Sequence, residues 1–308
     1  MTTPLPPSSD ARSSGPPDDR AVRFRWPFLD AADRSVLMAV LNVTPDSFSD
    51  GGELTTPAAV VARARVAEAE GADLLDLGGE STRPGAQRVS PAEQIRRVVP
   101  ALRALREAGI GLPVSVDTTR AEVAQAALDA GAVIVNDVSG GTEDPEMLGL
   151  IARTGAGCVL MHRAAPPGRD VYSTAYDTEP EYPGGVVDAV RTALVDLVAR
   201  ALSAGVAREQ IVVDPGLGFG KSVGQNARLL ARASAFQGLG SGVLIGASRK
   251  SFLGALTGEP EPARRVPESV AAAVLGRWAG ANVFRVHDID PHRRALDVAD
   301  AAVRHARE

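Results

Sequence analysis

The sequence predicts an α/β protein made of a single (β/α)8 barrel behind a disordered N-terminal tail. From about residue 36 one unit repeats: a short β-branched or leucine-rich run, a polar loop with glycine, and a segment of helical period. Eight such runs fit within about 270 residues. The chain shows no interior linker, so one barrel fits better than two doubly wound domains.

The apolar runs follow one another in a regular order. They are VLMAVLNV (36–43), DLLDLGG (73–79), LPVSVD (112–117), AVIVND (132–137), GCVLMH (157–162), IVVDPG (211–216), GVLIGAS (242–248) and NVFRVHD (282–288). Helical segments between them include 56–71, 90–109, 120–131, 185–205 and 269–280. Several of these end on a glycine, which suits a helix C-terminus.

Composition limits the class of protein. Residues 1–22 are rich in Pro, Ser and charge, so we expect a disordered tail before a barrel domain at 23–308. The formal charge of −5 gives no basic footprint for nucleic acid. The single cysteine, Cys158, excludes an internal disulfide framework. No apolar run approaches the ~18 residues of a membrane span and no signal peptide is evident, so we expect a cytoplasmic protein.

Polar residues able to do chemistry follow each apolar run. In a barrel the C-terminal ends of the strands form one rim, where active sites lie. A lone Asp before a helix is more often a cap, but eight such ends together indicate a site. The groups are Asn42, Asp76 with Glu80, Asp117, Asn136 with Asp137, His162, Asp214, Ser248 to Lys250, and Arg285 with His287.

One glycine-rich stretch, DPGLGFGKS (214–222), could be mistaken for a nucleotide-binding motif. A P-loop would need glycine at position 215, where Pro215 stands, and Lys221 occupies the last glycine position of G-x-G-x-x-G. The histidines show no zinc-type spacing. The mixture of carboxylates, amides and cations instead suggests a polar heterocycle at one end of the ligand and an anion at the other.

Eight motifs in order resemble the dihydropteroate synthase family. They are LNVTPDSFSDGG (41–52), LDLGGESTRPGA (75–86), VDTTRAEV (116–123), NDVSGG (136–141), VLMH (159–162), DPGLGFGK (214–221), GASRKSFLG (246–254) and RVHD (285–288). The resemblance implies a pterin-binding barrel that joins 6-hydroxymethyl-7,8-dihydropterin pyrophosphate to p-aminobenzoate, in a homodimer with Mg²⁺ as cofactor. Positions 118–120 depart from the commoner family pattern, but Arg120 keeps the charge.

The resemblance also implies roles for individual residues. The pterin would be bound by Asp117, Asn136, Met161, Asp214 and Lys250. The pyrophosphate would be bound by Asn42, Thr82, Arg83, Arg285 and His287, with Asn42 also the Mg²⁺ ligand. The p-aminobenzoate ring would lie between Phe48, Pro84, Phe219 and Ser248. Lys250, Asp117 and Arg285 would be catalytic.

The loops at 42–52 and 80–86 are expected to close over the mouth and to create the p-aminobenzoate slot only once the pterin diphosphate is bound. Two alternatives stay open. A folate-binding methyltransferase domain of the corrinoid type would share the barrel but would not need STRPG, SRK and RVH together. A non-catalytic pterin-binding paralogue differs only in the integrity of its motifs, and these are intact here. Segment 163–185 is long and has no assigned role.

Overall fold

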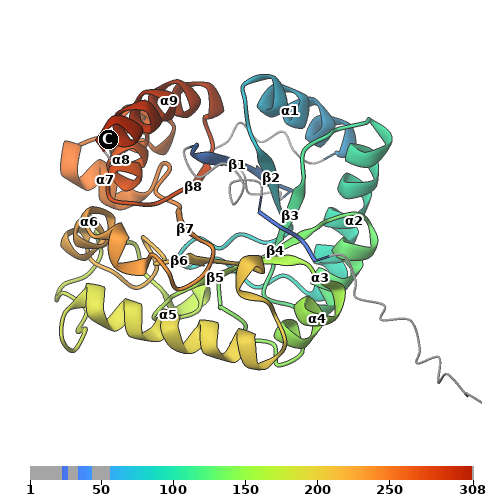
Figure 1. The fold of residues 1–308 in the computed structure, drawn as a ribbon, viewed down its shortest axis with the longest axis horizontal. Coiled ribbons are helices and arrows are strands. Elements are labelled where there is room, and N and C mark those ends of the chain that lie inside the picture. The colour runs from blue at the N-terminus through green and yellow to red at the C-terminus, as the bar shows by residue number, and fades with distance from the viewer. Residues whose placement is uncertain (1–22, 27–33, 44–55, 307–308) are drawn as a thin grey trace, which may run out of the picture.

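The computed structural model describes residues 23–26, 34–43 and 56–306, and within them eight parallel strands close into a barrel in chain order (Figure 1). This confirms the predicted fold. The strands are β1 (Val36–Asn42), β2 (Leu74–Gly78), β3 (Val114–Asp117), β4 (Ile134–Asp137), β5 (Gly157–Met161), β6 (Ile211–Asp214), β7 (Gly242–Ile245) and β8 (Val283–Val286). The predicted tail at 1–22 lies outside the described residues.

Helices surround the barrel (Figure 1). They are α1 (Pro57–Ala69), α2 (Pro91–Glu107), α3 (Ala121–Asp129), α4 (Met147–Thr154), α5 (Val186–Ser203), α6 (Val223–Ala231), α7 (Ser251–Thr257), α8 (Val266–Trp278) and α9 (Ile289–His305). Short 3₁₀ turns lie at Pro167–Arg169, Arg208–Gln210, Ala233–Phe236 and Pro262–Arg264. The expected helical segments all form helices. Ser90 and Ser222 cap the starts of α2 and α6 through their side-chain oxygens, which explains where these helices begin.

One end of the barrel interior is filled by apolar side chains. Trp26 is fully buried there among residues near the starts of the strands, such as Val36, Leu74 and Val283. Its indole Nε1 donates to the Gln210 carbonyl at 3.0 Å, and Phe24 meets its ring edge to face at 5.5 Å. A second apolar layer lies between the strands and the helices. Because the N-terminal end of the barrel is plugged, a ligand can enter only from the C-terminal ends.

None of the helices in the described part of the chain combines the length and the apolar character needed to cross a bilayer.

Candidate active site

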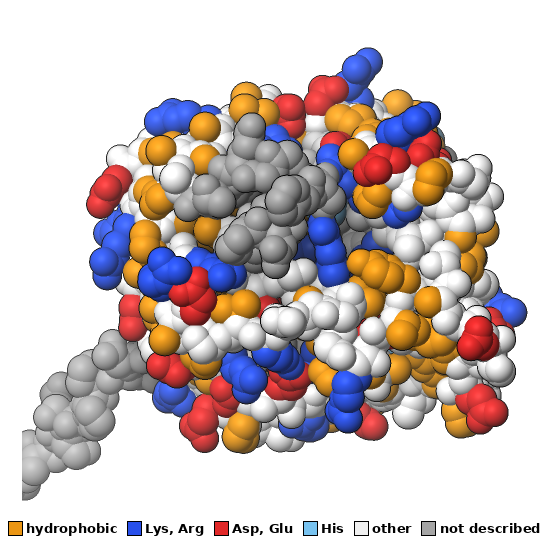
Figure 2. Space-filling model, turned by 180° about the vertical axis from the view of Figure 1, so that it is seen from behind, with side chains coloured by type: hydrophobic (Ala, Val, Ile, Leu, Met, Phe, Trp, Pro, Cys, Tyr) orange, Lys and Arg blue, Asp and Glu red, His pale blue; other side chains and the backbone are white. Residues whose placement is uncertain are grey.

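A pocket of about 220 Å³ opens at the C-terminal ends of the strands. Figure 2 shows this face, where Lys and Arg side chains gather around the hollow. All expected site residues that the structure describes line the pocket: Asn42, Thr82, Arg83, Pro84, Asp117, Asn136, Met161, Asp214, Phe219, Ser248, Lys250, Arg285 and His287. Phe48 lies outside the described residues. Barrel closure thus brings together residues that are up to 245 positions apart, from Asn42 to His287.

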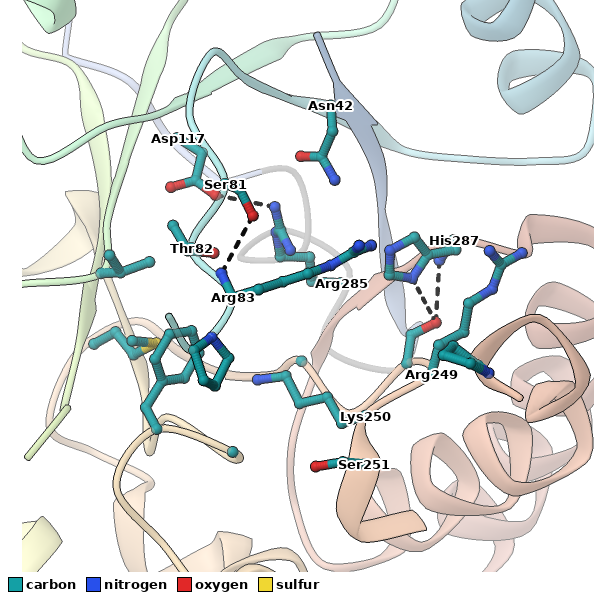
Figure 3. Close-up of a pocket in the computed structure, with 18 of the residues that line it drawn as sticks. Asn42, Ser81, Thr82, Arg83, Asp117, Arg249, Lys250, Ser251, Arg285 and His287 are labelled. Atoms are coloured by element: carbon teal, nitrogen blue, oxygen red, sulfur yellow. Dashed lines mark hydrogen bonds and ion pairs between the residues drawn. The ribbon is translucent and has the colours of Figure 1, made fainter. Parts of the chain in front are cut away.

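A buried carboxylate, Asp76 on β2, organises the floor of the pocket. Its Oδ2 accepts hydrogen bonds from Arg285 Nε at 2.6 Å and from Asn136 Nδ2 at 3.1 Å. Arg285 Nη2 donates to Asp117 Oδ2 at 3.0 Å (Figure 3). Four strands are joined in this way, and the orientations of Asn136, Asp117 and Arg285 are fixed before any ligand binds.

Several buried acceptors at this floor are not used. Within the described residues, Asp76 Oδ1, Asp117 Oδ1 and Ser115 Oγ have no hydrogen-bond partner. Burial raises the pKa of Asp117 to about 7, and the neighbouring Arg285 guanidinium opposes this rise. An unpaired buried carboxylate oxygen is costly, so the floor favours a ligand that presents N–H donors.

The β6 side of the pocket combines a carboxylate, an ammonium and an aromatic ring. Asp214 Oδ1 accepts from the Gly216 amide at 2.7 Å. Lys250 Nζ donates to the Leu217 carbonyl and lies 4.4 Å from the centroid of the Phe219 ring. Burial lowers the pKa of Lys250 to about 8, while Asp214 acts in the opposite direction. Met161 and Val138 pack with Phe219 to form an apolar wall between the polar groups.

The β8 side of the pocket is cationic (Figure 3). Burial, followed by the charges of Arg249, Arg285 and Arg83, lowers the pKa of His287 well below its usual value, so the ring is neutral. Ser248 Oγ accepts from the His287 backbone amide at 3.2 Å and lies 3.0 Å from His287 Nδ1. The Ser248 hydroxyl can therefore donate to Nδ1, which leaves the proton on Nε2 as a donor for an anion.

Comparison with known proteins identifies this arrangement. The family of pterin-binding enzymes matches residues 38–287. The dihydropteroate synthase of Synechocystis sp. is 41% identical over 273 residues, which cover 89% of this chain and 92% of that one. The chain belongs to the dihydropteroate synthase family. The enzyme of Mycobacterium leprae is 44% identical over 274 residues, covering 86% of this chain and 92% of its own.

Solved structures of the family agree with the fold. Dihydropteroate synthase from Yersinia pestis, in complex with a sulfonamide drug, superposes with a TM-score of 0.81 at 37% identity, covering 88% of this chain and 95% of that one. The enzyme from Xanthomonas albilineans with 4-aminobenzoic acid gives 0.78 at 44% identity, covering 88% and 94%.

The loop after β7 carries backbone strain at the pocket. Arg249 has φ of 61°, and it is the one non-glycine residue of the described chain with positive φ. Three groups hold it: Ser269 Oγ accepts from its amide at 2.9 Å, Arg265 Nη1 donates to its carbonyl at 3.0 Å, and Asp288 pairs with its guanidinium at 2.7 Å. This over-determined turn places Ser248 and Lys250 on either side of Arg249.

The loop after β2, which carries Thr82, Arg83 and Pro84, is anchored beyond these residues. Arg88 pairs with Glu143, which also pairs with Arg163. The Gly85 amide donates to the Pro167 carbonyl at 2.9 Å. Part of segment 163–185 therefore supports this loop, a role for which the sequence offered no signal.

Four predicted strand-end groups do not line the pocket: Asp76, Glu80, Asp137 and His162. Asp76 is buried beneath it, and Glu80 accepts from the Val89 amide at 2.8 Å. Asp137 accepts from the amides of Ser139 and Gly141 at 2.7 and 2.8 Å, so it stabilises a turn. His162 pairs instead with the buried Lys221. Arg249, predicted as a strand-end group, also lines the pocket. Other residues that line it were not predicted for the site: Ser81, Val138, Tyr172, Gly218, Gly246, Ser251, Pro262 and Arg265.

Proposed function

We propose that the chain is a catalytically active dihydropteroate synthase. It condenses 6-hydroxymethyl-7,8-dihydropterin pyrophosphate with p-aminobenzoate, giving 7,8-dihydropteroate and pyrophosphate for folate biosynthesis. One observation carries this proposal: one pocket holds the unpartnered Asp117 Oδ1 at its floor and a cluster of cations at its side. The structures of relatives with 4-aminobenzoic acid and with 7,8-dihydropteroate support the same chemistry.

The pterin is proposed to bind at the floor. Its guanidine-like edge carries N–H donors that suit the free oxygen of Asp117 and the carboxylate of Asp214, while Asn136 supplies an amide. Met161 would pack on the ring face, and Lys250 would donate to the ring carbonyl and N5 side.

The pyrophosphate is proposed to bind on the cationic side. Arg83, Arg285 and the Nε2 proton of His287 are suitable donors, and Thr82 adds a hydroxyl. Asn42 would hold a Mg²⁺ ion. Within the described residues no group of three or more His, Cys, Asp or Glu could hold a metal. Mg²⁺ takes few protein ligands and keeps water or phosphate oxygens as the others, so one amide oxygen at Asn42 suits it. When bound, Mg²⁺ would neutralise charge on the phosphate oxygens.

The reaction breaks the bond between the pterin methylene carbon and the bridging phosphate oxygen. Positive charge develops on the methylene and pterin, and negative charge on the leaving pyrophosphate. Asp117 is placed to stabilise the first and Arg285 the second, and the two are already joined at 3.0 Å. The aniline nitrogen of p-aminobenzoate then forms the new C–N bond, and its extra proton passes to solvent or to the released pyrophosphate.

The p-aminobenzoate ring is proposed to lie near the mouth, between Pro84 and Phe219, with Ser248 in the wall and Phe48 contributed by the loop at 42–52. Because the Ser248 hydroxyl already engages His287, we assign Ser248 a place in the wall and a supporting role for the histidine. Lys250 lies over the Phe219 ring, so it adjoins both substrates.

An assay of pyrophosphate release tests this function. With the dihydropterin pyrophosphate and Mg²⁺ present, release should depend on p-aminobenzoate. Pterin binding without any release would instead indicate a non-catalytic pterin-binding paralogue. The matched control is Asp297→Asn, since Asp297 is a 61% exposed carboxylate on α9 that lies outside the pocket lining.

We further propose a cytoplasmic homodimer. Leu256 on α7 and Leu275 and Trp278 on the neighbouring α8 are 57–63% exposed. Leu275 and Trp278 are three residues apart, so they share one face of the helix. A second copy of the chain would cover these side chains, and Trp278→Glu should then shift the mass measured by light scattering from dimer to monomer.

A further inference from the structure

Lysine is almost absent from this chain. Of its 33 Lys and Arg residues only two are lysines, Lys221 and Lys250, and the exposed cations are all arginines. Lys250 belongs to the pocket described above. Lys221 is fully buried and does not line the pocket, and the reaction as described leaves it without a role.

The surroundings of Lys221 explain why arginine does not occupy this position. Its Nζ lies 2.8 Å from the Gly216 carbonyl, 2.9 Å from the Phe219 carbonyl, 3.0 Å from His162 Nδ1 and 3.4 Å from the His162 carbonyl. An ammonium has three protons to donate, and the three shorter contacts match them in number. A planar guanidinium with five donors would not match this geometry.

The protonation of the histidine fits the same arrangement. Burial, together with the charge of Lys221, lowers the pKa of His162 to about 3, so the ring is neutral and Nδ1 can accept. Burial also lowers the pKa of Lys221 to about 7, against the opposing charge of Asp214. Below about pH 7 the group is an ammonium, and its hydrogen bonds replace those that water would make.

Lys221 joins two elements of the barrel mouth. His162 follows β5 directly, whereas Gly216 and Phe219 belong to the loop after β6. This loop carries the Phe219 ring and the Leu217 carbonyl, and Lys250 contacts both. At Gly216 φ is 69°, and a Cβ would overlap the His162 carbonyl oxygen, so the loop lies directly against the end of β5.

We propose that Lys221 is a positioning residue that fixes the p-aminobenzoate side of the site by tethering the loop 216–219 to His162. The inference rests on the proposed function. The pterin side depends less on this tether, because Asp214 and Met161 lie on paired strands in register with each other. Loss of the tether should therefore weaken p-aminobenzoate binding more than pterin binding.

A pair of variants at His162 tests the tether without removing the lysine. His162→Leu removes the Nδ1 acceptor and leaves only the longer contact of Lys221 with the carbonyl of position 162, at 3.4 Å, whereas His162→Asn keeps a side-chain oxygen that can replace Nδ1. We expect the KM for p-aminobenzoate to rise at least ~10-fold in His162→Leu, the scale of a lost charged hydrogen bond, and to stay within about 3-fold of wild type in His162→Asn. The dissociation constant of the pterin should change by less than about 3-fold in both.

Two further variants separate positioning from general stability. Lys221→Met keeps the length of the side chain but has no hydrogen-bond donor. As in His162→Leu, the KM for p-aminobenzoate should rise more than the dissociation constant of the pterin, and the rise should be larger than in His162→Leu. Tyr182→Phe is the matched control, since it removes another hydrogen bond to the same loop, from Tyr182 to the Gly220 carbonyl at 2.8 Å. Tyr182→Phe should lower the melting temperature without weakening p-aminobenzoate binding more than pterin binding. Equal losses for both substrates in His162→Leu, or no loss for either, would overturn the proposal.

Amide hydrogen exchange in the free protein measures how firmly the loop 216–219 is held, without any substrate. Amides of residues 216–220 should exchange at least ~10-fold faster in His162→Leu than in His162→Asn. Unchanged exchange in both would overturn the tether even if the enzyme is active. Faster exchange in His162→Leu, together with a wild-type protein that binds no pterin, would leave the tether in place and refute the proposed function.

Discussion

Replacing Asp117 by Asn should abolish much of the pterin affinity while leaving the fold intact or more stable. The carboxylate is 5% exposed, its Oδ2 accepts from Arg285, and its Oδ1 has no partner among the described residues. Asn keeps the shape and one acceptor for Arg285 but removes the charge. The change therefore separates recognition of the ligand from support of the barrel.

The magnitude follows from the bond that the ligand would make. A hydrogen bond to a charged group contributes about 1.5–3 kcal/mol, which corresponds to a rise of roughly 10- to 150-fold in the dissociation constant. Asp214→Asn should lose a similar amount. The stability of Asp117→Asn, unlike its pterin affinity, should not fall. Because the folded pKa of Asp117 is raised to about 7 from 3.8, its burial lowers the unfolding free energy progressively as pH rises from about 4 to 7. Asn has no such titration, so the variant should match or exceed wild-type stability at pH 8.

Calorimetry with a pterin measures the affinity, and thermal melts measure the stability, both across pH 5–8. Below about pH 7 the wild-type affinity should fall as Asp117 becomes protonated, whereas the Asp117→Asn affinity should be weak and nearly flat with pH. Wild-type affinity in Asp117→Asn at pH 8 would remove this residue from the site. A large loss of stability at pH 8 would show that the carboxylate is needed for the barrel and not for the ligand.

Three other perturbations follow from the same geometry. Lys250→Ala should lower turnover at least ~10²-fold, because it removes a preorganised electrostatic donor; near-normal turnover in a steady-state assay would place Lys250 at the rim only. In titration calorimetry, p-aminobenzoate and sulfonamides should bind weakly or not at all to the free protein and measurably once pyrophosphate, Mg²⁺ and a pterin are present; equal affinity in both cases would indicate a preformed slot. Deleting residues 1–22 should leave turnover and melting temperature unchanged, since this segment has no apolar face to bury, and a clear drop in either would show that it packs on the barrel.

The sequence predicted the fold because its signals are local. Each strand is a short apolar run, and the helices between them have their own caps, such as Ser90, which accepts from the Glu93 amide at 3.3 Å. The candidate site followed from the same order, since every strand end lies on one rim. Asn42 and His287 could be assigned to one pocket from the sequence because each lies at the C-terminal end of a strand.

Other features depend on contacts that local patterns do not encode. Asp76 organises the pocket floor through its contact with Arg285, which is 209 positions away. This contact depends on the register of β1 with its two neighbours, β8 and β2. The pairing of His162 with Lys221 turns a predicted strand-end group away from the pocket. Segment 163–185 has no period to read, yet its Tyr182 and Asp170 hold the loop after β6 at Gly220.

The most direct test of the central claim is to measure both products in one reaction. Incubated with 6-hydroxymethyl-7,8-dihydropterin pyrophosphate, p-aminobenzoate and Mg²⁺, the wild-type protein should form 7,8-dihydropteroate, seen by mass spectrometry, with one pyrophosphate released for each molecule formed, and Asp117→Asn should form far less. Pyrophosphate released without dihydropteroate, or no product at protein concentrations that bind the pterin, would contradict the assignment of this pocket as a synthase.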